Sequence, residues 1–171
     1  MATTLSGTVS STLQLNYAGS ASLSGSTLQE NIARSLTSSY TNGTGTGQVD
    51  RIYAQSGTFT ASTAITATFT NYTDCFGNST QTMARIKTLY FANLATADTV
   101  ANNVVFGGGS SIITSLLPGT SSVNIPGGGS ILINAPLAVC YTLTGGTHDT
   151  FTFTPGTGTP GYEFVVLGCS A

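Results

Sequence analysis

Charge is the scarcest property of this sequence. Its 171 residues include four Lys and Arg, six Asp and Glu and one His, so that charged residues make up 6% of the chain, against ~25% in typical soluble domains. The basic residues form no run or patch, which argues against direct nucleic-acid binding. Because free domains carry mixed charge for solubility, so uncharged a surface predicts that much of it is covered by partner subunits.

Long apolar runs and a leader-like N-terminus are also missing. No stretch approaches the ~18 apolar residues of a membrane span, and residues 1–7 have neither the positive nor the apolar region of a secretory signal. We therefore expect no membrane association and synthesis in a cytoplasm. The three cysteines, Cys75, Cys140 and Cys169, match no zinc spacing and leave one thiol over in any disulfide scheme. Buried free thiols are the expectation.

Catalytic and metal-binding patterns are nearly absent. His148 and Asp149 form the one pair that invites a catalytic interpretation, because an Asp can orient a His as a general base. The sequence lacks a Gly-x-Ser-x-Gly elbow, however, and residues 145–149 are typical of a turn between strands. The acids are scattered one to a segment, which favours neither a glycosidase pair nor a calcium loop. They are Glu30, Asp50, Asp74, Asp98, Asp149 and Glu163. We expect no enzyme, no cofactor and no metal.

Hydroxyl and amide side chains supply the polarity instead, beside a 40% share of hydrophobic residues. Disordered chains combine high charge with few apolar residues, so this chain is expected to fold. Its length suits one ordinary domain with a real core.

Short runs rich in β-branched and aromatic residues recur along the chain, separated by Gly and Pro. The longest is residues 84–94, in which Arg85, Lys87 and Leu89 are expected on one face and Ile86 and Tyr90 on the other. The other expected strands lie at 5–17, 49–53, 58–70, 104–106, 111–113, 123–125, 131–133, 140–143, 151–153 and 162–168. Eight to ten strands with at most one short helix predict an all-β fold, a single jelly-roll-type antiparallel β-sandwich.

The first quarter of the chain differs from the rest. Residues 1–47 are predicted to form an N-terminal strand or hairpin and a Ser/Thr/Gly-rich arm, and residues 48–171 the β-sandwich domain. Within the arm, Leu28, Ile32 and Leu36 recur at a spacing of four, which favours a short helix there.

The order of several elements carries a family resemblance. These are the run at 84–94, Val-Val-Phe-Gly-Gly at 104–108, Ile-Pro-Gly-Gly-Gly-Ser-Ile-Leu-Ile at 125–133, Asp-Thr-Phe-Thr-Phe at 149–153 and the final strand at 162–168. In this order the chain, from residue 48 to 168, resembles the small head-decoration (cement) and related structural proteins of tailed bacteriophages. The resemblance implies a jelly roll, usually trimeric, that sits on the capsid surface and ties major capsid subunits together.

The resemblance leads to a functional expectation: a capsid decoration protein of the virion, a homotrimer whose partner is the major capsid protein. Partner contacts are expected at Arg34, Arg85 and Lys87. The alternative is a receptor- or glycan-binding domain of a phage tail fibre or spike, because jelly rolls often present tyrosines and asparagines on a sheet face. A glycan-active enzyme using His148 or Glu163 is the weakest alternative.

Overall fold

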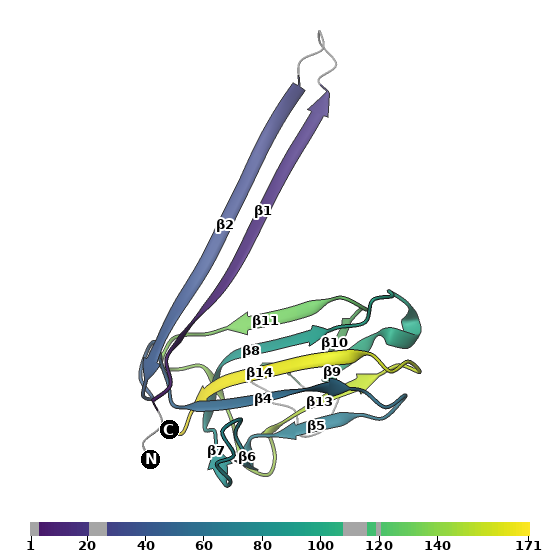
Figure 1. Cartoon of the computed structure of the whole chain (residues 1–171). Coiled ribbons are helices and arrows are strands. Elements are labelled where there is room, and N and C mark those ends of the chain that lie inside the picture. Colours follow the sequence, from purple (N-terminus) through teal and green to yellow (C-terminus); the bar gives the residue numbers. More distant parts are fainter. Residues whose placement is uncertain (1–3, 21–26, 108–115, 119–120) are drawn as a thin grey trace.

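The computed structural model describes residues 4–20, 27–107, 116–118 and 121–171. Strands dominate it, and the described residues include one single-turn 3-10 helix, Val100–Asn102. The chain has two parts, a two-layered sandwich and a long two-stranded arm that projects from one end of it (Figure 1). The predicted boundary between residues 47 and 48 falls where the arm enters the sandwich, at β3 (Gln48–Val49). The predicted strand at 111–113 lies outside the described residues.

Eight strands form the two antiparallel sheets of the sandwich, in the orders β11-β8-β14-β4 and β10-β9-β13-β5, and a short fifth strand (Tyr141–Thr142) joins the first sheet beside β8. In chain order the first of the eight pairs with the last, the second with the seventh, the third with the sixth and the fourth with the fifth. This nesting is the jelly-roll topology, and the predicted fold class is confirmed. The strands are β4 (Arg51–Thr58), β5 (Ile65–Thr68), β8 (Arg85–Asn93), β9 (Val104–Gly107), β10 (Ser122–Ile125), β11 (Ser130–Asn134), β13 (Thr150–Pro155) and β14 (Gly161–Cys169).

The core between the two sheets is largely aromatic. Along β13, Phe151 and Phe153 are buried while the threonines between them are half exposed, as the period-2 alternation predicts. The ring of Phe153 stacks on Phe91 of the opposite sheet with centroids 4.4 Å apart, and meets Phe164 edge-on at 4.7 Å. Burying each such ring stabilises the fold by roughly 1.5–3 kcal/mol. The sandwich therefore has a complete core of its own.

The strand predicted most strongly, β8, lies inside its sheet between β11 and β14. The register with β14 shifts between Leu167 and Gly168, which places an extra residue, Lys87, in β8. A Cβ on Gly168 would lie 2.3 Å from the carbonyl oxygen of Arg85, so only glycine fits opposite this bulge. The predicted faces of β8 are wrong in part, because a bulge reverses the alternation.

The expected break between the predicted strands at 49–53 and 58–70 is also wrong, because β4 runs without interruption to Thr58. The turn lies farther along, at residues 59–64, and the predicted strand at 58–70 begins as β5 at Ile65. Three short strands complete the sandwich: β6 (Thr70–Tyr72), β7 (Gln81–Thr82) and β12 (Tyr141–Thr142).

The arm is a β-hairpin. Strand β1 (Gly7–Ser20) pairs with β2 (Thr27–Asn42) over fourteen residue pairs, from Gly7↔Tyr40 to Ser20↔Thr27. The helix predicted around residues 28–36 is therefore wrong. Apolar residues four apart also share one face of a strand, whose period is two, and pairing with β1 decides between the two structures. At ~3.3 Å per residue, β1 is about 46 Å long.

Candidate functional site

The arm has two chemically different faces. In the antiparallel register, Val9 lies opposite Ser38, Ser11 opposite Leu36, and Leu13 opposite Arg34. The intervening residues, on the other face, carry hydroxyl and amide groups: Thr8, Ser10, Thr12, Gln14, Ser35, Thr37 and Ser39. Leu13, Leu15 and Leu36 are 58%, 50% and 62% exposed. The arm thus presents an apolar stripe that the described part of the chain leaves uncovered.

The root of the arm is fastened to the outer face of the β11-β8-β14-β4 sheet by buried polar groups. The hydroxyl of Tyr40 donates to Oδ1 of Asn134 at 2.6 Å and lies 3.1 Å from the hydroxyl of Thr88. Asn134 also accepts from Thr88 at 3.0 Å and donates to the hydroxyl of Ser38 at 2.7 Å. Burial raises the pKa of Tyr40 above its ordinary value, so its hydroxyl stays protonated and available as a donor. Tyr40 and Ser38 are buried, whereas Leu36, two residues farther out, is exposed.

The buried side chain of Lys87, on β8, also helps to hold the root of the arm in place. Its side chain is fully buried, and its ammonium donates to the carbonyl oxygen of Gly45, in the turn between the arm and β3. The bulge in β8 aims the side chain at this turn. Lys87 was expected to be an interface or solvated-edge charge. That expectation is wrong, because the side chain is enclosed and its charge stabilises the connection of the arm.

Arg85 and Arg34 have different surroundings. Arg85 is half buried and donates from Nη1 to the carbonyl oxygen of Ala138 at 2.8 Å, across the sheet end. Arg34 is exposed on the arm and donates to the carbonyl oxygen of Ala33 at 3.0 Å. The structure does not bring the three predicted residues together in one site. Partner contact by Arg34 and Arg85 stays a prediction.

A groove runs along the outer sheet face beneath the arm. Toward β11 it is lined by Val9, Ser11 and Leu36 of the arm and by Leu132 and Asn134. Toward β14 it is lined by Thr8, Val9 and Ser10 of the arm and by Thr88, Tyr90, Leu132, Val165 and Leu167 of the sheet. Apolar side chains of the sheet thus face Val9 and Leu36 of the arm, which lie beside hydroxyl groups. Individual residues of this groove were visible in the sequence as strand positions, but their meeting depends on the fold.

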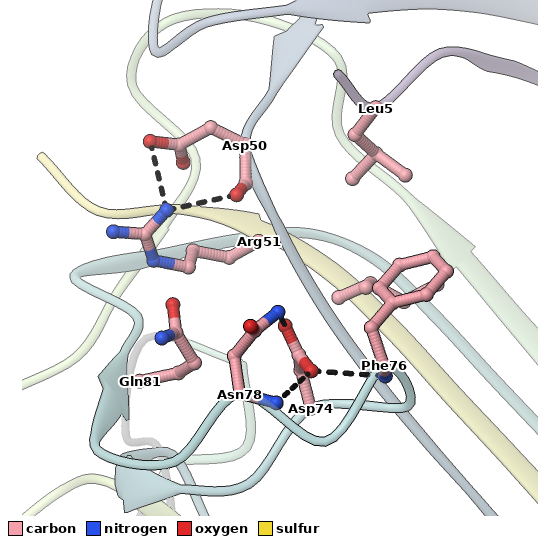
Figure 2. A pocket seen from close by; sticks show the side chains of 8 residues that line it. Leu5, Asp50, Arg51, Asp74, Phe76, Asn78 and Gln81 are labelled. Carbon is pink, nitrogen blue, oxygen red and sulfur yellow. Dashed lines mark hydrogen bonds and ion pairs between the residues drawn. The ribbon is translucent and has the colours of Figure 1, made fainter. Parts of the chain in front are cut away.

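A polar cavity of about 260 Å³ lies at the other edge of the sheet, lined by Leu5, Asp50, Arg51, Ile52, Asp74, Phe76, Asn78 and Gln81. Figure 2 shows that its two acids, Asp50 and Asp74, already interact with neighbouring residues of the chain. Asp74 accepts from the backbone N–H groups of Phe76 and Asn78, both at 2.9 Å, and from the Asn78 side chain at 2.8 Å. Although slight burial opposes it, this set of donors holds the pKa of Asp74 below its ordinary value.

Asp50, the other acid of the cavity, holds the C-terminal residues of the chain in place through Ser170. It accepts from the backbone N–H and the hydroxyl of Ser170 at 2.8 and 2.5 Å, and lies 3.3 Å from Nη1 of Arg51. Both carboxylates therefore act as acceptors that hold loops in place. Phe76 stands 62% exposed at the rim.

The His148–Asp149 pair lies in a tight turn. The backbone N–H of His148 donates to the carbonyl of Thr144 at 2.8 Å. The buried carboxylate of Asp149 accepts from the hydroxyl of Thr70 at 2.5 Å and from the backbone N–H of Gly146 at 3.0 Å. These contacts join the turn to β6, which is a structural role for Asp149.

The remaining candidate chemistry is sparse. Across the residues that the structure describes, no three His, Cys, Asp or Glu side chains gather as a metal site would require. Cys75, Cys140 and Cys169 are all free thiols, as predicted; Cys169 is buried, but Cys75 is exposed, which corrects the expectation for that residue. Burial raises the pKa of Cys140 and of Cys169 above the ordinary thiol value, so little of either is thiolate at neutral pH.

No protein-family model matches the chain, and no curated protein matches it in sequence. The resemblance to phage decoration proteins therefore stays a prediction. No helix in the described segments is long and apolar enough to cross a membrane. The class of protein that the structure defines is a jelly roll with a projecting amphipathic β-hairpin.

Proposed function

We propose that the chain is a structural protein of a virion, a capsid decoration protein that binds the outside of a phage head as a homotrimer and stabilises contacts between major capsid subunits. The observation that carries the structural role is the uncovered apolar stripe of the arm, with Leu13, Leu15 and Leu36 half or more exposed. Such a stripe on a soluble chain marks a surface that is buried in an assembly.

The distribution of polar groups supports an assembly role over catalysis. Asp50, Asp74 and Asp149 accept hydrogen bonds from Ser170, from Asn78 and from Thr70, respectively, which hold loops and strands in place. The buried cation, Lys87, is likewise turned toward the chain's own backbone. The chemistry of these groups is directed inward, and the described surface carries hydroxyls, amides and apolar side chains with few charges, among them Arg34, Asp98 and Glu163.

The jelly roll is a common architecture of viral capsid and lectin domains, but a fold alone does not set function. The resemblance in the order of elements directs the proposal to the outside of a capsid. A trimer that touches several capsid subunits at once gains from multivalency, so weak individual contacts hold it in place. Internal pressure loads the seams between capsid subunits, and the trimer adds contact area across them.

Add-back to undecorated capsids tests the proposal. Heads are produced from a virus whose copy of this reading frame is deleted, mixed with the purified protein and separated from free protein by sedimentation. We expect saturable co-sedimentation and a higher melting temperature of the decorated heads, with light scattering of the free protein giving the mass of a trimer. Heads that leave the protein in the supernatant at every concentration contradict the proposal.

A second candidate, a receptor- or glycan-binding domain of a tail fibre or spike, is favoured by one observation. Phe76, Asn78 and Gln81 line the same polar cavity, and the exposed ring of Phe76 lies on its Leu5 side (Figure 2). An aromatic ring and amide groups around one cavity suit a sugar ring. A glycan array probed with the wild type and with Phe76→Ala tests this candidate. Binding of the wild type that the substitution removes supports it, and no binding of the wild type to any glycan contradicts it.

A further inference from the structure

We propose that the apolar stripe of the arm packs into the outer-sheet groove of a second copy of this chain, so that each subunit gives one arm and receives one. The stripe consists of Val9, Leu13, Leu15 and Leu36, and the groove of Tyr90, Leu132, Val165 and Leu167. The inference rests on the self-association within the proposed function and is independent of the capsid.

The first argument is continuity with a contact that the chain already makes. At the root, Ser38 and Tyr40 on the same face of the arm are buried against this sheet, hydrogen-bonded to Asn134. Val9 and Leu36 still line the groove, beside Leu132. Toward Val165 and Leu167 the groove is lined on the arm side by Thr8, Val9 and Ser10 of the root, and beyond this root the arm rises away from the sheet (Figure 1). Leu13 and Leu15, farther out on the stripe, do not line the groove of their own chain.

The second argument is chemical complementarity. The sheet side of the groove carries apolar groups and the hydroxyls of Thr88 and Tyr90. The described part of the stripe carries apolar side chains and one cation, Arg34, beside Leu13. Carboxylates or ammonium groups of a charged partner would be desolvated against the apolar stripe without compensation, whereas the groove of a second copy has no charged side chain in its lining. The long side chain of Arg34 can keep its guanidinium in water at the edge of the contact. A second copy also exists at the same concentration wherever the chain is made.

The third argument is area. Strand β1 continues from Thr12 to Ser20 beyond the groove-lining part of the arm. Nine residues at ~3.3 Å, on a ribbon ~10 Å wide, give a face of about 300 Å². In a closed ring each subunit buries about 300 Å² where it gives its arm and about 300 Å² where it receives one, whereas a standard interface buries ~800 Å² per partner. Each subunit therefore needs both contacts, because one arm alone buries less than half of that area.

Cross-linking of two differently tagged copies tests the pairing. One copy carries Leu15→Cys and the other Leu132→Cys, both in a Cys75→Ser background because the native Cys75 is exposed. Leu15 lies four residues, ~13 Å, beyond Ser11 along the strand, and Ser11 is the outermost β1 residue that lines the groove with Leu132. A disulfide within one chain is out of reach, since it requires Cα atoms within about 7 Å.

We expect a mixed disulfide dimer of the two tagged copies on oxidation, and at least a five-fold lower yield when Gln14→Cys, on the hydroxyl and amide face, replaces Leu15→Cys. Equal yields from the two positions overturn the proposal. So does a Leu15→Cys homodimer without the mixed species, which indicates pairing between arms.

The oligomeric state provides a second, independent readout. Leu13→Asp with Leu15→Asp is expected to shift the assembly to monomers in light scattering, whereas Thr12→Asp with Gln14→Asp, of the same charge on the opposite face, leaves it intact. Near-ultraviolet circular dichroism of the buried rings verifies that the sandwich is folded in both. A wild type that is monomeric at every concentration overturns the inference. Because no capsid is present, its failure is separable from failure to decorate heads.

Discussion

The arm and the sandwich share one sequence pattern, but the apolar residues of that pattern are buried in the sandwich and exposed in the arm. Strand β13 alternates threonine with buried phenylalanine, and β1 alternates Ser, Thr and Gln with Val and Leu. In β13 the apolar face lies against a second sheet, so Phe151 and Phe153 are buried, whereas in β1 no second layer from the described part of the chain covers Leu13 and Leu15. A period of two thus specifies a face that needs cover, and the cover can come from the same chain or from another.

Removal of an aromatic ring from the core is expected to have the largest effect on stability. Phe164→Ala is expected to lower the free energy of unfolding of the sandwich by about 3–5 kcal/mol, because Phe164 contacts Phe91 and Phe153 in the core. Leu13→Ala on the arm should change it by less than about 0.5 kcal/mol. Denaturant titration at low protein concentration, followed by near-ultraviolet circular dichroism, measures both. A loss at Leu13 as large as at Phe164 contradicts the division between core and arm.

The addition of one methyl group is expected to destabilise the sandwich but not the arm. Gly168→Ala is expected to destabilise the sandwich by about 1–3 kcal/mol, because the new Cβ would lie 2.3 Å from the Arg85 carbonyl oxygen. Gly7→Ala, at the start of the arm, meets nothing within 4 Å and is the matched control. Thermal melts of the two variants give the comparison. A neutral Gly168→Ala would mean that the bulge at Lys87 relaxes freely.

A substitution at the root of the arm is expected to have a smaller effect on stability. Tyr40→Phe removes the hydroxyl that donates to Asn134 and is expected to lower stability by about 1 kcal/mol, as for one intramolecular hydrogen bond. Ser39→Ala, the neighbouring position on the exposed face, is the control, with less than about 0.5 kcal/mol expected. Urea midpoints measure both. Hydrogen exchange at residues 38–42 should speed up in Tyr40→Phe alone.

The smallest expected effect is the pH dependence of the 74–78 loop. The folded-state pKa of Asp74 is lowered, so its contribution to stability is present above the unfolded-state value of ~3.9 and is lost as the pH falls through the folded-state value. Because the group is partly exposed, solvent screening keeps the contribution small. Chemical denaturation of the wild type and of Asp74→Asn at pH 6 and pH 3 should show a smaller decline in the variant. Parallel declines would contradict it.

The strand pattern and turn residues predicted the sandwich well, because each strand buries one face and Gly or Pro marks most turns. They predicted the first strand of the arm, at 5–17, but not the second: an apolar spacing of four in residues 28–36 fits helix and strand alike, and only pairing with β1 decides. They also missed the bulge at Lys87, which depends on Gly168, far away in sequence. Burial of Lys87 was invisible for the same reason, since its acceptor is the backbone of Gly45.

The fastening of the arm also has a geometric consequence. With an arm about 46 Å long, a rotation of about 10° at its root moves its tip by about 8 Å. The hydrogen bonds of Tyr40, Thr88 and Asn134, together with the Lys87 ammonium on Gly45, therefore fix a lever angle. In any shell or ring built through the arms as proposed, that angle would set the curvature and the number of copies that close the circle.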